Sequence, residues 1–596
     1  MKLHVAAALL LLSLGPSGPA AAAADLILRG GHIITMNPAQ PRVEAVAVKG
    51  GRIVAVGASA ALMKSQRGKG TRVVDLGSRA LLPGFIDAHS HIAQYEATWG
   101  MPVLSPPPVG DVGSVGDIVD RLRSHIEARR LPQGTLVLGH GYDDSLLAEG
   151  RHPTRADLDR VSTVHPVMVI HASGHLLVAN SLAMRKVGVS RDTPDPAGGL
   201  IRRDPAGEPD GVMEELAGMP FLALLQRASL ERRLKHLGEI QRFYASHGVT
   251  TAQDGISMPE DLALLGEAAR RKQLILDVVA YPRWDVSRDV LEGRRALVLR
   301  PPAPGANAPY RPTTGASPAA KPGEAMPLVL AGYRNRFRMG GIKITADGSP
   351  QGKTAFLTAP YVHPPHGQPA DYRGYPTVTQ EELDRWFDFS WTRGLPLIVH
   401  CNGDAAADQM IAAVRKAVAT HGPRDMRPVM IHAQMIRHDQ VDAMAELGIV
   451  PSFFTAHTFF WGDWHRAETV GPERAAGMSP AAYAQTRGIA FTNHTDAPVV
   501  PPDQLMLVWT AVNRVSRSGV VVGPEERITP LAALQAITQN AARQYFEERD
   551  KGSLEPGKLA DLVILDRNPL EVDPMAIRNI RVLETLKEGR TIYRRR

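Results

Sequence analysis

Two histidines separated by one residue, His89 and His91, follow an apolar run that ends at Ile86. If this run is a strand, residues two apart point to the same face, and both imidazoles would face one point. Imidazole nitrogen is a usual ligand of zinc. The chain has 21 histidines, so one such pair is weak evidence by itself. A metal site requires further ligands from other parts of the chain.

Further candidate ligands stand within other short apolar runs or at their ends. They are Lys343 in 342–346, His400 at the end of 397–400, His432 at the end of 429–432 and Asp496 just after 489–493. Imidazole and carboxylate groups are the ligands expected for a catalytic zinc or a similar divalent ion. Asp87 shares the side of the first run with the two histidines but lies one step deeper. We interpret it as support for the ligands rather than as a ligand.

Eight short apolar runs predict strands, and helical patterns follow several of them. The runs are 85–89, 248–253, 274–280, 342–346, 397–400, 429–432, 449–453 and 489–493. Eight β/α units predict an α/β fold, a closed (β/α)8 TIM barrel. An open doubly wound sheet would need a Gly-rich phosphate-binding turn after its first strand, and this sequence has none there. Barrels do their chemistry where the C-terminal strand ends meet, so the candidate ligands would converge.

Both ends of the chain show patterns of β structure. Paired glycines separate short β-branched runs in 25–82, and 545–596 contains further runs of this kind. Neither end has enough strands for a stable sheet, so we expect both ends together to form one small β-sandwich domain. The barrel would then occupy 83–544. An inserted subdomain at about 101–245 would cover the barrel mouth, and a Pro-rich stretch at 301–327 would form a surface loop.

Composition and the N-terminus limit the classes of protein that fit. A basic start, a short apolar core and small residues predict a secretory signal peptide at 1–24, and therefore a secreted or periplasmic protein. The single cysteine, Cys401, rules out an intrachain disulfide. The formal charge is +7, but no basic run occurs, which argues against a nucleic-acid partner. No later apolar run reaches about 18 residues, so the sequence predicts no membrane span after the signal peptide.

Several motifs resemble those of one enzyme superfamily. They are Gly84-Phe85-Ile86-Asp87-Ala88-His89-Ser90-His91, Ile342-Lys343-Ile344-Thr345-Ala346-Asp347-Gly348-Ser349, Val399-His400-Cys401-Asn402-Gly403-Asp404, Thr495-Asp496-Ala497-Pro498 and the closing stretch 552–565. The chain resembles the amidohydrolase superfamily, and within it the YtcJ-like amidohydrolase 3 group, which includes N-substituted formamide deformylases. The resemblance covers nearly everything after the signal peptide.

The resemblance implies a role for each candidate ligand. His89 and His91 would hold a first metal, and His400 and His432 a second. Lys343, carboxylated on its amine, would bridge the two, because a carbamate is an anionic ligand where an ammonium group would be repelled. Asp496 would bind metal and act as general base. We expect zinc, as one or two ions; the alternative is a single metal beside an unmodified Lys343.

The predicted insertion carries candidate substrate residues. The run 167–175 ends in two histidines four apart, His171 and His175, and Asn180 follows. The resemblance implies that this stretch lies beside the active site, whereas a helix cap and a surface histidine are the structural alternative. Tyr142 and Asp143 are further candidates for the same pocket. We expect a structural role for Cys401, and the role of His494 stays open.

These inferences predict a metal-dependent hydrolase that cleaves an amide-type C–N bond in an N-acyl or N-formyl compound. A metal-activated water would attack and Asp496 would take its proton. The same chemistry on an ester, lactone, carbamate or imine is the alternative within enzymes. A periplasmic metal-binding or small-molecule-binding protein is the alternative outside them. The expected partner is a small-molecule substrate, and a homodimer is one assembly that the sequence leaves open.

Overall fold

The computed structural model describes residues 23–196, 198–225, 228–292, 297–299, 328–330, 332–365 and 367–596. The expected signal peptide falls outside these residues except for its last two, and the Pro-rich stretch 301–327 falls outside them entirely.

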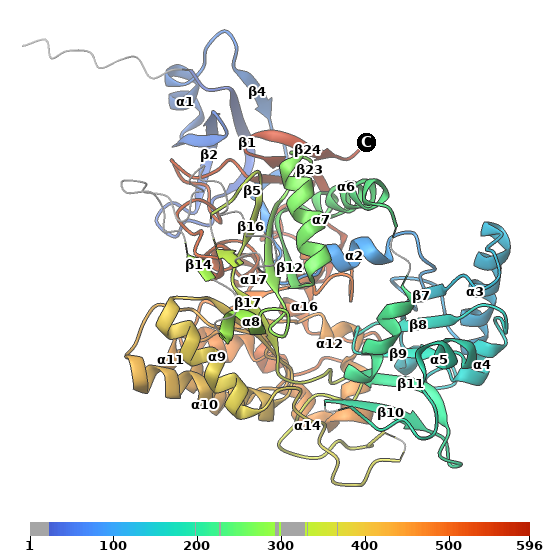
Figure 1. Cartoon of the computed structure of the whole chain (residues 1–596). Coiled ribbons are helices and arrows are strands. Elements are labelled where there is room, and N and C mark those ends of the chain that lie inside the picture. The colour runs from blue at the N-terminus through green and yellow to red at the C-terminus, as the bar shows by residue number, and fades with distance from the viewer. Residues whose placement is uncertain are drawn as a thin grey trace, which may run out of the picture.

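Strands from the two ends of the chain form one eight-stranded sheet. Its order is β24-β23-β22-β5-β1-β2-β3, with β4 paired to β1. The strands are β1 (Leu26–Ile34), β2 (Arg42–Lys49), β3 (Arg52–Gly57), β4 (Arg72–Asp75), β5 (Ala80–Pro83), β22 (Leu562–Leu565), β23 (Val582–Lys587) and β24 (Arg590–Arg594), and α1 is Ser59–Ser65. In β1, Leu26 and Leu28 pack into one apolar cluster and Ile27 into another, so both faces are buried. Figure 1 shows these first and last strands side by side. The two-layer sandwich remains a prediction.

A second sheet lies in the predicted insertion, with order β10-β11-β9-β8-β7. Its strands are β7 (Val137–Tyr142), β8 (Val167–His171), β9 (Leu176–Ala179), β10 (Gly199–Arg203) and β11 (Pro209–Glu215), with helices α3 (Val115–Arg129), α4 (Arg155–Asp159) and α5 (Ser181–Val187). A cluster that includes Leu122, Val169 and Val178 forms the core between α3 and the sheet. In Figure 1 this unit lies to one side of the central strands.

Parallel strands in two sheets form the centre of the molecule. One sheet has the order β16-β13-β12-β6 and the other β17-β18-β19-β20-β21. The strands are β6 (Phe85–Ile86), β12 (Val249–Ser257), β13 (Asp277–Pro282), β16 (Phe337–Met339), β17 (Ile342–Thr345), β18 (Leu397–Cys401), β19 (Val429–His432), β20 (Val450–Phe453) and β21 (Thr492–Asn493). A short pair, β14 (Leu297–Leu299) and β15 (Leu328–Leu330), stands apart.

A few backbone contacts join the two parallel sheets at both ends. Arg283, just after β13, forms a parallel bridge with Lys343 of β17. At the other end, the Asp496 N–H donates to the His89 carbonyl at 3.0 Å, but β6 and β21 share no ladder in the described part of the chain. The fold is therefore a mixed α/β fold whose strand pairing does not close into a continuous barrel.

Helices alternate with the central strands. They are α2 (Ile92–Thr98), α6 (Leu230–Ser246), α7 (Pro259–Arg270), α8 (Arg288–Leu291), α9 (Gln380–Arg393), α10 (Asp404–His421), α11 (His438–Leu447), α12 (His457–Phe460), α13 (Gly462–Trp464), α14 (Gly471–Ala476), α15 (Ala481–Thr486), α16 (Gln504–Asn513), α17 (Pro530–Ala536) and α18 (Gln539–Gln544). In α9, Thr379 caps the first turn and Gly394 ends the helix in the left-handed conformation. Leu383, Trp386 and Phe387 recur at helical spacing and are buried.

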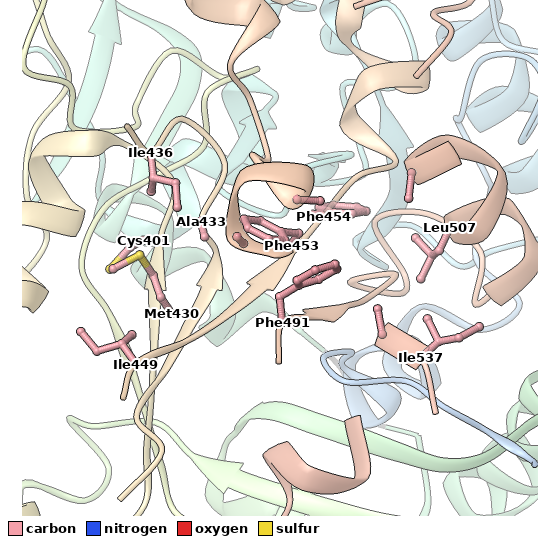
Figure 2. Close-up of a cluster of buried hydrophobic side chains, with 14 of the residues drawn as sticks. Cys401, Met430, Ala433, Ile436, Ile449, Phe453, Phe454, Phe491, Leu507 and Ile537 are labelled. Carbon is pink, nitrogen blue, oxygen red and sulfur yellow. The ribbon is translucent and has the colours of Figure 1, made fainter. Parts of the chain in front are cut away.

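The largest apolar cluster lies between these helices and the second parallel sheet. Figure 2 shows part of it, with Cys401, Met430, Phe453 and Phe491 among its members. Strand alternation explains why Cys401 enters this core while its neighbour His400 lies on the other face of β18. Cys401 is a free, buried thiol, as expected for a structural residue. No helix among the described residues is long and apolar enough to cross a bilayer.

The strand bounds correct one step of the sequence argument. The first strand was expected to run from 85 to 89, but β6 ends at Ile86. His89 and His91 therefore lie in the segment that leads into α2, and His91 is its N-cap. Strand alternation does not bring them together. The expected last strand, 489–493, is also shorter, since β21 comprises only Thr492–Asn493.

One buried carboxylate connects the central strands to the sheet of the two ends. Asp277 Oδ2 at the start of β13 lies 2.6 Å from Lys551 Nζ and 2.7 Å from Lys587 Nζ. Burial alone would raise the pKa of Asp277, but these ammonium groups outweigh it and hold the pKa well below its ordinary value. The carboxylate therefore stabilises the fold at neutral pH, and this stabilisation is lost as the pH falls through its folded pKa, below about 4.

We predict that Asp277→Asn lowers the free energy of unfolding by about 3 kcal/mol at pH 7, because one partner of a buried ionic network is removed. Urea titration followed by circular dichroism measures the change. The gap to the wild type should narrow below about pH 4, where the Asp277 carboxylate of the unfolded chain begins to be protonated while that of the folded chain stays ionised. Asp111→Asn, which disrupts an exposed pair with Arg121, is the control and should leave the midpoint nearly unchanged. Equal shifts for both variants would contradict the assignment.

Candidate metal centre

Six side chains predicted as metal ligands come from five places in the central fold. His89 and His91 follow β6, Lys343 lies in β17, His400 in β18, His432 ends β19, and Asp496 follows β21. All but His91 are buried, and the His91 side chain is 12% exposed. The parallel order of β17 to β20 brings the ends of these strands to one edge.

The first group of contacts surrounds His89. Its Nε2 lies 3.2 Å from Lys343 Nζ and 3.4 Å from Asp496 Oδ1. His91 Nε2 lies 3.0 Å from the same Asp496 oxygen. Ligand atoms of His89, His432 and Asp496 all lie within 4.8 Å of one another. The structure thus brings together residues that are up to 407 positions apart in the sequence, from His89 to Asp496.

The second group is a pair of imidazoles whose protons can be assigned. His400 Nε2 lies 3.0 Å from the Gly348 carbonyl, which can only accept, and 3.0 Å from the Asn402 side-chain amide. We assign the proton of His400 to Nε2, facing the carbonyl, which leaves Nδ1 bare. His432 Nδ1 lies 3.1 Å from His494 Nε2, and His494 Nδ1 lies 2.9 Å from Ser452 Oγ. We assign donation from His432 to His494 and onward to Ser452. His494 is thus a partner that orients His432.

The bare nitrogens of this pair face each other. His400 Nδ1 and His432 Nε2 are 3.1 Å apart. Two lone pairs at this distance repel, and a cation between them would convert the repulsion into ligation. Burial, together with neighbouring cationic groups, lowers the pKa of His89, His400 and His432 well below the ordinary value, so all three are neutral. Neutral imidazoles beside a carboxylate are the donor set that a divalent metal requires.

Supporting contacts fix His89 as well. His89 Nδ1 forms a short hydrogen bond with Gln253 Oε1, which leaves Nε2 free to face the ligands. Gln253 Nε2 in turn donates to the Ala88 carbonyl at 3.1 Å and to the Tyr545 hydroxyl at 2.9 Å. A Cβ at position 255 would lie 2.3 Å from the His89 ring, so only glycine leaves room for this imidazole.

Two ligands adopt an unusual backbone conformation. His432 has φ of 73° and Asp496 has φ of 56°, in the left-handed region that costs energy for residues other than glycine. Asp87 holds the second of these turns, because the Thr495 N–H and hydroxyl donate to its carboxylate at 3.1 and 2.5 Å. Such strain persists where surrounding contacts enforce it, and it is commonest at functional sites.

The electrostatics of Asp496 and Lys343 differ from those of the imidazoles. Burial alone would raise the pKa of Asp496, but the hydrogen bond from His91 and nearby cationic groups lower it, so the carboxylate is ionised at neutral pH. Burial lowers the pKa of Lys343 to about 7, so a substantial fraction of this amine is neutral near pH 7.

A small polar cavity opens onto these residues. It is lined by Ser173, His175, Ser349, Gln351, His400, Asn402, His432, Phe454, His457 and Asp496. A larger cavity lies near the N-terminal end of β13, between Arg52, Arg338 and Glu588. The charged side chains of that cavity are paired with one another, as Arg338 is with Glu547 at 2.8 Å. We therefore assign the chemistry to the smaller cavity, because the candidate ligands His400, His432 and Asp496 line it.

Of the predicted substrate residues, His175 reaches this cavity. Its Nδ1 lies 2.8 Å from Glu215 Oε2, and its ring centroid lies 4.9 Å from that of His400. Burial alone would lower the pKa of His175, but the Glu215 carboxylate outweighs it and raises the pKa. In its protonated form, which the raised pKa favours, His175 carries a proton on Nε2 and can donate a hydrogen bond there.

Three other predicted substrate residues belong to a separate buried cluster. His171 Nε2 lies 3.0 Å from Asp144 Oδ1 and 4.0 Å from Asp143 Oδ1, and Tyr142 bonds His152 at 3.0 Å. The Ser173 N–H donates to His171 Nδ1, so we assign the proton of His171 to Nε2. A protonated nitrogen cannot ligate a metal, and the cluster is an ionic network beside the cavity.

Asn180 has a structural position. Its side-chain oxygen accepts from the backbone N–H groups of Val167 and Ala183, which caps α5, and its amide donates to two carbonyls. The structure does not bring Asn180 to the cavity.

Two residues after β17 have structural contacts. The Lys353 ammonium lies over the Trp464 ring at 4.9 Å, and the Asp347 carboxylate accepts hydrogen bonds from three backbone N–H groups.

Sequence reasoning missed Gln253, Glu215 and His457. Gln253 ends the predicted strand 248–253, and a polar residue at a strand end could have been recognised as a candidate site residue. Glu215 and His457 lie in no recognisable motif, and only the fold brings them to the cavity.

Comparison with known proteins places the chain in a family. The amidohydrolase family profile matches residues 72–593. The chain is 25% identical over 580 residues to the putative amidohydrolase YtcJ of Bacillus subtilis (95% of this chain, 99% of that protein). It is 26% identical over 525 residues to N-substituted formamide deformylase of Arthrobacter pascens (87% and 89%). The fold resembles that of an uncharacterised metal-dependent hydrolase from Pyrococcus horikoshii, with TM-score 0.67, 23% identity and coverage of 92% and 99%. Because the profile spans most of its length, this chain belongs to the amidohydrolase family.

Proposed function

We propose that the protein is a metal-dependent hydrolase that cleaves an amide-type C–N bond in an N-acyl or N-formyl compound. The observation that carries the proposal is the convergence of three neutral imidazoles, those of His89, His400 and His432, with the ionised carboxylate of Asp496 beside the polar cavity. The similarity to a formamide deformylase supports the choice of a C–N bond over other carbonyl compounds.

The candidate ligands would hold one or two divalent ions, which we propose to be zinc. His89, His91 and Asp496 would serve one position, and His400 Nδ1 with His432 Nε2 the other. When bound, such an ion lowers the pKa of water and polarises a carbonyl group. We also propose that Lys343 is carboxylated, since its neutral amine is the form that reacts with carbon dioxide.

Asp496 is suited to accept a proton. Its lowered pKa keeps the carboxylate ionised at neutral pH, and its side chain lines the cavity where water and substrate would meet. After taking a proton from the attacking water, Asp496 can deliver it to the leaving nitrogen. His175, held by Glu215, also lines this cavity and in its protonated form can donate a hydrogen bond to the substrate from Nε2.

The barrel, the β-sandwich, export and the homodimer also remain proposals. We propose that the central strands function as a (β/α)8 barrel whose ligand edge is the catalytic face, with the sheet of the two ends as a β-sandwich beside it. Export through a signal peptide and assembly as a homodimer are further proposals. Determination of the mature N-terminus in an expressing cell tests the first, and sedimentation analysis tests the second.

We predict that His432→Ala lowers the amount of divalent metal retained by the purified protein, because one of two facing nitrogen ligands is lost. Elemental analysis gives the metal content per chain. His438→Ala is the matched control. His438 begins α11, stacks on Tyr483 of α15 and does not line the cavity. Unchanged metal in His432→Ala would argue against this ligand assignment.

We predict that the wild type hydrolyses members of a panel of N-formyl and N-acyl amines, and that a chelator abolishes the activity. Restoring zinc should restore the rate, because the proposed nucleophile depends on the metal. Product amine is measured by a fluorogenic amine reagent. Chelator-resistant hydrolysis, or cleavage of esters but of no amide, would overturn the proposal.

We predict that Asp496→Asn lowers kcat by about 10²–10⁴-fold, because the side-chain amide of asparagine cannot accept the proton of the attacking water. The variant keeps one oxygen ligand, so much of the metal should remain. Rates and metal content are measured on the same preparation. Normal turnover with full metal content would rule out Asp496 as the general base.

A further inference from the structure

A third histidine, His457, lines the cavity without belonging to the ligand set. It begins α12, after β20, and is 2% exposed. Its ring is packed against Phe454 and Trp461, with centroids 4.8 and 4.5 Å away. The Trp461 indole N–H donates to Asp143 at 2.6 Å, which fixes this loop against the inserted sheet. His457 is therefore a rigid part of the cavity wall.

A chain of hydrogen bonds leads from His457 away from the cavity. His457 Nδ1 lies 3.0 Å from His465 Nε2, and His465 Nδ1 lies 2.9 Å from Thr469 Oγ1. The Thr469 hydroxyl donates to the His465 carbonyl at 3.4 Å. His465 and Thr469 begin and end a single π-helical turn, which places the hydroxyl beside the ring.

We assign the proton on each ring from the direction of this chain. With the Thr469 hydroxyl donating to the His465 carbonyl, its oxygen accepts from His465 Nδ1–H. His465 Nε2 is then bare and accepts from His457 Nδ1–H. His457 Nε2 is left without a proton, and no hydrogen bond to it occurs within the described residues. It is the nitrogen that this ring offers to the cavity.

We propose that His457 Nε2 accepts a hydrogen bond from an N–H group of the substrate at the bond to be cleaved, and so selects secondary amides over esters and N,N-disubstituted amides. This inference rests on the proposed function and narrows its substrate class. The cavity would then carry a donor, His175, for the carbonyl side of the substrate, and an acceptor, His457, for its nitrogen side. A substrate without the N–H would leave a buried acceptor unpaired, which costs binding in the transition state.

The test compares three substrates with the metal-loaded protein: formanilide, N-methylformanilide and phenyl formate. The first carries the N–H, and the other two lack it. We expect His457→Ala to lower kcat/KM for formanilide by about 10–100-fold, the effect of one lost hydrogen bond in a buried site. The two compounds without N–H should change by less than about 3-fold, since they make no such bond. His438→Ala should leave all three rates unchanged.

Thr469→Val tests the same chain without opening a cavity, because valine has nearly the shape of threonine. Losing the hydroxyl acceptor removes the constraint on the His465 proton, so formanilide alone should slow, by a smaller factor than in His457→Ala. Nitrogen-15 spectra of histidine-labelled, metal-free protein give a readout independent of activity. The resonance that His457→Ala removes should have the shift of an unprotonated Nε2, and Thr469→Val should move it.

The outcomes distinguish a failure of this inference alone from a failure of the proposed function. Equal losses for all three substrates in His457→Ala would show that His457 only maintains the cavity wall, and would overturn the inference while hydrolysis stands. A protonated Nε2 signature would overturn it as well. If the wild type cleaves phenyl formate but neither anilide, C–N bond hydrolysis fails and the inference fails with it. If none of the three is cleaved, hydrolysis of N-formyl compounds is contradicted.

Discussion

The constraint on which the site depends is the burial of several nitrogen donors next to one another. His89, His400 and His432 are each at most 4% exposed, and their nearest nitrogen contacts are close to 3 Å. Charged imidazoles could not coexist at these distances away from water, so burial and mutual proximity keep them neutral. The lone pairs that result repel one another unless a cation lies among them. The fold must therefore hold this arrangement by forces outside the ligand set.

Those forces are hydrogen bonds from the rear of each ligand. Gln253 fixes His89, the Gly348 carbonyl fixes His400, and His494 fixes His432, in each case by taking the ring proton that does not face the site. Each contact selects a tautomer as well as an orientation, so the bare nitrogen points inward. The turns at His432 and Asp496 add backbone strain that these contacts and the Asp87–Thr495 hydrogen bonds offset.

The sequence allowed the convergence of the candidate ligands to be predicted because strand order places strand ends on one edge. Lys343, His400 and His432 lie in three neighbouring parallel strands, β17, β18 and β19, whose pairing brings these residues close together. His89 and His91 were grouped correctly for an incorrect reason, since β6 ends before them and contacts with Asp496 bring them together. Gln253, Glu215 and His457 depend on contacts between distant segments, and local pattern contains no information about such contacts. The proton positions depend on carbonyls such as that of Gly348, which sequence reasoning cannot place.

The candidate metal ligands and the groups proposed to face the substrate belong to different elements of the fold, and this matters for specificity. The candidate metal ligands come from the central strands and the segments directly after them, whereas the groups that we propose to face the substrate come from other elements. His175 and Glu215 belong to the inserted sheet region, and His457 to the segment after β20. The Trp461–Asp143 hydrogen bond connects these two regions without involving a ligand. A substitution in the insertion can therefore alter which donors and acceptors meet the substrate while the ligand geometry stays intact. Because metal-activated water can attack amides and esters alike, our proposal assigns the choice of carbonyl compound to the pairing of a donor with an acceptor on the cavity wall rather than to the metal.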